Sequence, residues 1–197
     1  MQITYSKFEH ELNGFLKSYL EDDSFDCLKE RLDLSENKAD LLSEKINDFY
    51  NQQLQIDKNY AKDRIRVDRI ITFSEKTLPK GKFCKFLIEL AWICASEGKL
   101  ELASEIFRKA NKISDNDSTK AESLFGLADV FSRKANWSRS LEAINKANSI
   151  FKNLDDFRGV AKCQNFLGAI YGEMGDIHKA KKYLQICLSL INRDEDL

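Results

Sequence analysis

The sequence predicts an all-α fold, with about four N-terminal helices followed by three helical hairpins that stack into a short right-handed solenoid. One proline and eight glycines among 197 residues leave few of the breaks that separate strands in a β-rich protein. Apolar residues instead recur at helical spacing along the first eighty residues, and a spacing of small residues repeats three times in the remainder. We therefore assign residues 1–80 to an N-terminal helical region and residues 81–197 to a repeat domain.

Four amphipathic segments make up the N-terminal region. Apolar residues fall at intervals of about three or four in residues 6–20, 22–32, 35–54 and 58–77. Pro79-Lys80-Gly81 follows the last segment and is expected to end that helix. Residues 51–58 are the expected hinge between the third and fourth helices, although one continuous helix through them is also compatible with the pattern.

A spacing of small residues repeats three times in the second half of the chain. In each copy, a small residue is followed by a second after 12 positions and by a third after 7 more. The three sets are Ala91, Ala103 and Ala110; Ala128, Ser140 and Ala147; and Gly168, Ala180 and Cys187. Large residues keep the same register, namely Leu90, Leu127 and Leu167 just before the first small residue, and Phe107, Ile144 and Leu184 16 positions after it.

This pattern indicates a helical hairpin, because small residues where two helices cross let the backbones approach while large residues fill the flanking grooves. The two helices of each hairpin are joined by turns at residues 97–99, 134–136 and 174–176. We expect Gly168 to lie at a helix crossing, Gly175 to form a turn, and Gly172 to face solvent or a groove.

The three hairpins resemble the tetratricopeptide repeat family, whose signature is this pattern of small and large residues. The resemblance covers residues 84–192, with repeats spaced 37 and 40 residues apart rather than about 34. The best match is the third repeat, through Leu167-Gly168, Tyr171, Gly175-Asp176, Ala180 and Leu184. Repeats of this length are similar to those of bacterial peptide-sensing regulators and of eukaryotic motor and polarity adaptors.

The resemblance implies a concave groove, lined mainly by the first helix of each hairpin, that binds an extended peptide or a helix of a partner. Trp92 and Phe125 among polar neighbours have the composition of a contact hot spot, unless the N-terminal helices fold back and cover them. The predicted partner-binding residues are Lys85, Ile88, Trp92, Phe125, Asp129, Arg133, Lys162 and Asn165.

One groove type in the family clamps a C-terminal carboxylate with lysine and asparagine side chains. At four of the five corresponding positions this chain has Ile88, Trp92, Gly126 and Phe166, and only Lys162 matches. We therefore expect negligible affinity for the acidic C-terminal tails of heat-shock chaperones, which a peptide titration would check.

The charge distribution does not favour a nucleic-acid partner. Residues 1–57 carry 6 Lys and Arg against 13 Asp and Glu, and the net charge of the chain is −1. No tight turn followed by a basic recognition helix occurs in this acidic region, as a helix-turn-helix protein would require. The sequence has no apolar run long enough to span a bilayer.

Neither a metal site nor a catalytic motif is evident. The five cysteines are scattered and form no C-x-x-C pair, which is typical of reduced thiols in a cytoplasmic protein. The two histidines, His10 and His178, stand alone, and no phosphate-binding, metalloprotease or nucleophile motif appears. We expect neither enzymatic activity, nor a metal, nor a cofactor.

The predicted function is that of a cytoplasmic scaffold or adaptor that binds a protein or peptide partner in the solenoid groove, with no nucleic acid or membrane as partner. Two alternatives remain open from the sequence. The first is a regulator in which a bound peptide bends the solenoid. The second is a structural subunit that assembles into a homo-oligomer. Copurification, ligand-dependent compaction and concentration-dependent mass would distinguish the three.

Overall fold

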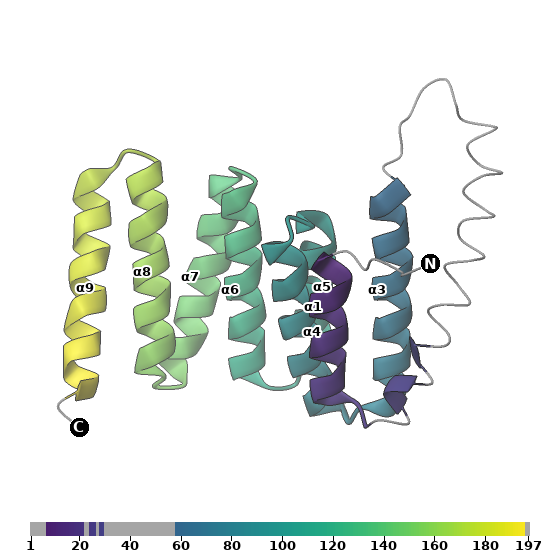
Figure 1. Cartoon of the computed structure of the whole chain (residues 1–197). Helices are drawn as coiled ribbons and strands as arrows, with labels where there is room; N and C mark the ends of the chain where they lie inside the picture. The colour runs from purple at the N-terminus through teal and green to yellow at the C-terminus, as the bar shows by residue number, and fades with distance from the viewer. Residues whose placement is uncertain (1–6, 22–23, 27, 30–57, 196–197) are drawn as a thin grey trace, which may run out of the picture. The chain divides into compact units, whose positions relative to one another are not determined.

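The computed structural model describes residues 7–21, 24–26, 28–29 and 58–195, and every regular element in these ranges is an α-helix, as predicted (Figure 1). The elements are α1 (Lys7–Tyr19), α3 (Lys58–Thr77), α4 (Lys80–Ser96), α5 (Leu100–Ile113), α6 (Asp117–Arg133), α7 (Trp137–Asn153), α8 (Phe157–Glu173) and α9 (Ile177–Glu195). The chain divides into two compact units, Met1–Phe83 and Cys84–Leu197, and each unit is described by itself.

In the first unit, α1 and α3 bury the apolar faces that their spacing predicts. Leu12 and Leu16 of α1 and Val67 and Ile70 of α3 are at most 1% exposed. The amine of Lys17 lies 5.2 Å from the ring centroid of Phe25, next to the last turns of α1. The fourth predicted segment is confirmed as α3, with the same ends.

Parts of the N-terminal prediction fall on residues that the structure does not describe. Residues 24–26 and 28–29 of the second predicted segment are helical. The third predicted segment, residues 35–54, lies outside the described residues, and so does the expected hinge apart from Lys58.

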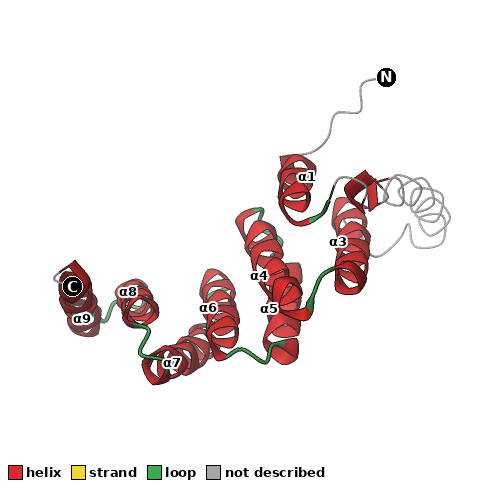
Figure 2. Cartoon of the chain, turned by 90° about the horizontal axis from the view of Figure 1, so that it is seen from below, coloured by secondary structure: helices red, strands yellow, loops and turns green. Residues whose placement is uncertain are grey.

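The second unit consists of three hairpins, α4–α5, α6–α7 and α8–α9, of which α4 begins just before the unit boundary. Consecutive helices from α5 to α9 pack against one another. In the view of Figure 2, α6 and α8 lie on one side of the row and α7 lies on the other. This alternation gives the repeat domain two layers, with the first helices of the hairpins in one of them.

The predicted register of small residues is confirmed. All nine small positions are buried, as are Leu90, Leu127 and Leu167. A Cβ atom added to Gly168 would lie 2.7 Å from Cγ of Leu184, so this glycine does sit at the crossing of α8 and α9. Gly126 plays the same part between α5 and α6, because its Cβ would lie 2.3 Å from the ring of Phe107. Gly172 is exposed, as expected.

The hairpin turns share one backbone geometry. Gly98, Ala135 and Gly175 have φ angles of 74°, 53° and 81°, in the left-handed region that closes many helices. In each turn the amide of the following residue donates to a carbonyl five residues earlier, as Asp176 N does to Tyr171 O at 2.8 Å. Asp155, at φ 53°, gives the connection between α7 and α8 this same geometry.

Side-chain caps begin α7, α8 and α9, the helices that follow three of these four turns. Asn136, Asp156 and Asp176 each accept a hydrogen bond from the backbone amide three residues later, at 3.3, 2.8 and 3.0 Å. Such caps satisfy amides that have no partner inside the helix. Asp156, at the boundary between α7 and α8, is therefore the cap of α8.

Candidate partner-binding surface

All eight predicted partner-binding residues lie on the first helices of the hairpins. Their side chains differ in exposure, because these helices also carry the packing between hairpins. Lys85, Arg133, Lys162 and Asn165 are exposed, Trp92 and Asp129 are half-buried, and Ile88 and Phe125 are buried.

The aromatic members of this set belong to a row of rings that runs across the first helices. Trp92 of α4 lies 6.3 Å from Phe125 of α6, and Phe125 lies 5.3 Å from Phe166 of α8, measured between ring centroids. Trp92 also makes an edge contact, at 5.2 Å, with Phe107 of α5. Rings at these separations and tilts attract one another and bury large apolar areas. We call Trp92, Phe125 and Phe166 the aromatic row.

Phe166 was not among the predicted site residues. It stands two positions before Gly168, whereas the register used for prediction selects the residue three positions before it, Asn165. The corresponding residue of α6 is Gly126, so the repeat pattern gives no aromatic signal at this position.

An ion pair within α6 is hydrogen-bonded to the end of α4. Arg133 Nε lies 2.7 Å from Asp129 Oδ2, and Arg133 Nη1 donates to the carbonyl of Ala95 at 3.3 Å. Burial raises the pKa of the Asp129 carboxyl above its ordinary value, although Arg133 opposes this shift. Both side chains therefore take part in packing one hairpin on the next, and Arg133 keeps an exposed edge.

Lys162 connects the aromatic row to the last hairpin. Its amine lies 4.5 Å from the ring centroid of Phe125, in reach of a cation–π interaction. The stem of Lys162 lines a hollow of about 570 Å³ between α8 and α9, which Asn165 also lines. We call this hollow the terminal groove.

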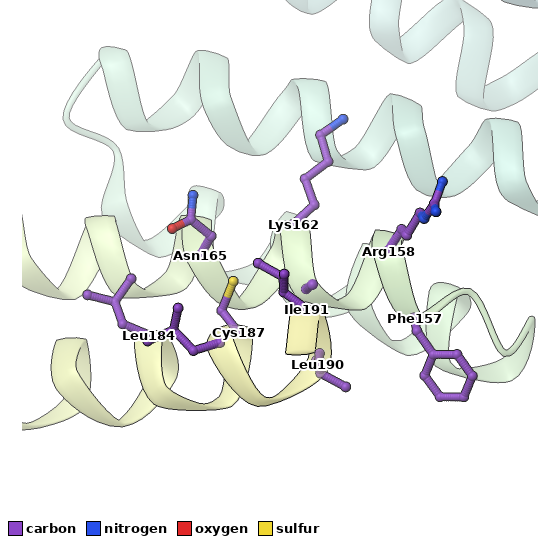
Figure 3. A pocket seen from close by; sticks show the side chains of 10 residues that line it. Phe157, Arg158, Lys162, Asn165, Leu184, Cys187, Leu190 and Ile191 are labelled. Atoms are coloured by element: carbon purple, nitrogen blue, oxygen red, sulfur yellow. The ribbon is translucent and has the colours of Figure 1, made fainter. Parts of the chain in front are cut away.

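The terminal groove is mainly apolar with a basic edge (Figure 3). Three of its lining residues have polar side chains that are cationic or amide, namely Arg158, Lys162 and Asn165, and none of the ten is acidic. The remaining seven are Phe157, Ala161, Leu184, Cys187, Leu188, Leu190 and Ile191. In Figure 3, Lys162 and Asn165 project from α8, and Leu184, Cys187 and Ile191 from the neighbouring α9.

Only two of these ten residues, Lys162 and Asn165, were predicted from the sequence. Leu184 was expected to pack at a helix crossing, and it does contact Gly168, yet 41% of its surface is exposed. Leu188 and Ile191 are 59% and 44% exposed. The repeat pattern does not distinguish Leu184 from its buried equivalents, Phe107 and Ile144.

Four cysteines in the described ranges, Cys84, Cys94, Cys163 and Cys187, are buried. Burial raises the pKa of the Cys163 thiol to about 12, so this thiol stays protonated and weakly nucleophilic at neutral pH. Within the described residues, no group of three His, Cys, Asp or Glu side chains could hold a metal ion. His10 and His178 are exposed. The described helices include none that is both long and apolar enough to cross a bilayer.

Comparison with known proteins identifies the repeats. A family model of the tetratricopeptide repeat matches residues 85–117 and 161–194, which correspond to the first and third hairpins. No curated protein matches the chain.

Solved structures with the same fold include the BtubC (BKLC) protein of P. vanneervenii, at 18% identity and a TM-score of 0.58, covering 96% of this chain and 75% of that one. Two structures of tetratricopeptide-like repeats from a putative kinesin light chain of Podosopora anserina, one of them a variant with a single substitution, are 14% identical. Their TM-scores are 0.54 and 0.52, with coverage of 89% and 87% of this chain and 96% and 95% of those chains.

Proposed function

We propose that this chain, which carries tetratricopeptide repeats at residues 85–117 and 161–194, is a protein-interaction scaffold that binds a peptide or helix of a partner along the first helices of its hairpins. The repeats and the solenoid fold support an interaction scaffold in general. Stacked hairpins offer many side chains along one line, which suits an extended segment or a helix.

The observation that carries the proposal is the terminal groove at the end of the aromatic row. Lys162 and Asn165 were selected from the sequence as groove-facing, and both line this open, apolar hollow. A concave apolar surface with a few polar groups at its edge has the composition of a binding site. Lys85 and Arg133 place further exposed cations on α4 and α6.

The proposal includes no catalytic step and no cofactor, and it places the protein in the cytoplasm with a protein as partner. The buried cysteines of the repeats and the near-neutral net charge of the chain support this view. We further propose that residues 1–80 act as a separate helical region beside the repeats.

A paired capture experiment tests the proposal. The full chain and the variant Lys162→Glu/Asn165→Glu serve as baits in a lysate of the native cell, and bound proteins are identified by mass spectrometry. Both substituted side chains are exposed, so the variant should fold. The control variant Glu142→Lys/Lys146→Glu reverses an exposed ion pair on α7 that lies outside the terminal groove.

A protein captured by the full chain and by the control, but not by the groove variant, is the expected result. Its purified form should then bind the full chain directly. If every captured protein also binds the groove variant, binding at this surface is wrong. If the purified chain instead shows a concentration-dependent mass that the groove variant abolishes, the homo-oligomer alternative replaces the proposal.

A further inference from the structure

The second helices of the three hairpins carry equivalent residues with very different exposure. At the position 16 residues after the first small residue, Phe107 and Ile144 are fully buried, whereas Leu184 is 41% exposed. At the position 23 residues after it, Ser114 and Phe151 are 5% and 3% exposed, whereas Ile191 is 44% exposed. The face that α5 and α7 bury is therefore left open on α9.

The buried faces of α5 and α7 are covered by the first helix of the next hairpin. Asn111 of α5 donates to the carbonyl of Lys120 in α6 at 3.1 Å. Asn148 of α7 accepts from Gln164 Nε2 of α8, also at 3.1 Å. Each internal second helix thus holds the following helix through an asparagine at the same position of the repeat.

In α9 the residue at this position is Leu188, which is 59% exposed. A helix face that meets water in a solenoid is expected to be polar, because no neighbouring helix buries its apolar side chains. The face of α9 instead presents Leu184, Leu188 and Ile191 at intervals of four and three, which is the stripe of a helix that packs on another helix. The terminal groove lies between this stripe and α8. In the inner repeats, the equivalent position is occupied by the next helix along the chain, since α6 packs there on α5 and α8 packs there on α7.

The charges around the groove indicate which kind of helix fits. Two cations, Arg158 and Lys162, line it, and none of the ten lining residues is acidic. Lys181 of α9, three positions before Leu184, is also exposed and lies on the side of the stripe. A second copy of this basic face would be repelled, whereas a helix with acidic side chains beside its apolar stripe would be attracted.

We propose that the terminal groove binds an amphipathic helix of a partner protein, with an aliphatic stripe and acidic flanks, which packs on α9 as α6 packs on α5 and α8 on α7. This inference rests on the proposed scaffold function and specifies the partner of the same surface. Leu188 is the expected centre of the contact, since an aliphatic side chain of the partner helix meets it where the internal helices place a hydrogen-bonded asparagine.

The test uses a synthetic peptide that imitates the missing neighbour. Its sequence is that of α8, residues 157–173, with Arg158→Glu, Lys162→Glu, Gln164→Leu and Cys163→Ala. A lactam bridge between exposed positions stabilises the helix, because an isolated helix of this length is marginal in water. A matched peptide keeps every apolar residue and carries lysine at the two introduced glutamates.

Fluorescence anisotropy of the labelled peptides is measured against the full-length chain. The acidic peptide should bind about tenfold more tightly than the basic one, with an affinity that falls as salt rises from about 50 to 500 mM. Leu188→Glu should weaken the acidic peptide about tenfold or more. Lys162→Glu should remove most of the difference between the two peptides, because one cation and one anion would then line the groove. Met174→Glu removes an exposed apolar side chain outside the groove and should change neither affinity.

Several results would overturn the inference. Equal affinities of the two peptides would show that the groove does not prefer an acidic helix. An unchanged affinity of Leu188→Glu for the acidic peptide would show that the peptide does not contact this face of α9. Failure of the acidic peptide to bind at about 1 mM excludes a helix of this kind. A concentration-dependent mass that Leu188→Glu abolishes makes a second copy the occupant. Partner capture that depends on Lys162 and Asn165 but survives Leu188→Glu would leave the scaffold function standing and refute this inference alone.

Discussion

The helices α7 and α9 have the same pattern of small and large residues and different surroundings. Ile144, Ala147 and Phe151 of α7 are at most 3% exposed, and α7 packs against both α6 and α8. Leu184 and Ile191, at the corresponding places in α9, are 41% and 44% exposed. The comparison teaches that the repeat pattern sets how a helix packs within its hairpin, while burial of its outer face depends on whether a neighbour follows.

The largest expected difference between the two helices comes from truncating their equivalent apolar residues. Ile144→Ala should lower the free energy of unfolding by about 2–5 kcal/mol, because it leaves a cavity in a closed core. Leu184→Ala should cost less than about 2 kcal/mol, since much of that side chain already meets water. Urea denaturation followed by circular dichroism measures both. Equal losses would show that the outer face of α9 is covered in solution.

The crossing of α8 and α9 allows a comparison between two glycines of α8, one at the crossing and one exposed. Gly168→Leu should lower the free energy of unfolding by about 1–3 kcal/mol, because even a Cβ atom would lie 2.7 Å from Leu184 Cγ. Gly168→Ala should cost less, since the half-exposed Leu184 can rotate away. In the control Gly172→Ala, the added Cβ would meet nothing nearer than Ala180 Cβ at 4.0 Å, and a gain of up to about 1 kcal/mol is expected. Destabilisation by the control would contradict this assignment.

A hydrogen bond peculiar to the middle hairpin gives a smaller difference. Ser140 Oγ donates to the carbonyl of Ala128 at 2.7 Å, across the crossing of α6 and α7. The equivalent residues, Ala103 and Ala180, cannot make this bond. Ser140→Ala should therefore cost about 1 kcal/mol, whereas Ser149→Ala, at an exposed site of α7, should have little effect or stabilise slightly. Equal melting temperatures for Ser140→Ala and the parent protein would show that the bond contributes nothing.

The smallest expected effect concerns the turns that precede α7 and α9. Ala135 has φ 53°, a conformation that costs an L-residue about 1–2 kcal/mol, whereas the last turn has Gly175 at the same position. Ala135→Gly should stabilise the protein by about 0.5–1 kcal/mol, after the greater chain entropy of glycine is subtracted. Gly98→Ala is the reverse exchange in the first turn and should destabilise by a similar amount. Thermal melts measure both changes, and a lower midpoint for Ala135→Gly would refute the expected gain.

Much of the fold could be predicted because it depends on local spacing. The ends of α3 and the contact role of Gly168 follow from apolar periodicity and from the small residues that helix crossings require. The left-handed turn at Asp155 was not foreseen, because the pair Asp155-Asp156 has the composition of a helix cap, and its backbone angle leaves no other sign in the sequence.

Less of the candidate surface could be predicted. Trp92 and Phe125 were selected because they fall on the predicted register, but Phe166 of the same aromatic row lies one position away from it. Periodicity could not reveal that Leu184 and Ile191 are exposed, because the equivalent Ile144 and Phe151 of α7 are buried. Leu188 differs in sequence from its equivalents Asn111 and Asn148, but that difference does not show whether a helix packs on it.

The left-handed residue at Asp155 has a consequence for how such a chain can grow. From α6 onward, the connections inside the hairpins and the connection between them use the same turn, at Ala135, Asp155 and Gly175. A gene duplication that copied α7 with α8 would therefore join its ends through the same backbone geometry as one that copied α6 with α7. The recombination boundary need not coincide with the hairpin, and the array can lengthen by helix pairs taken in either phase.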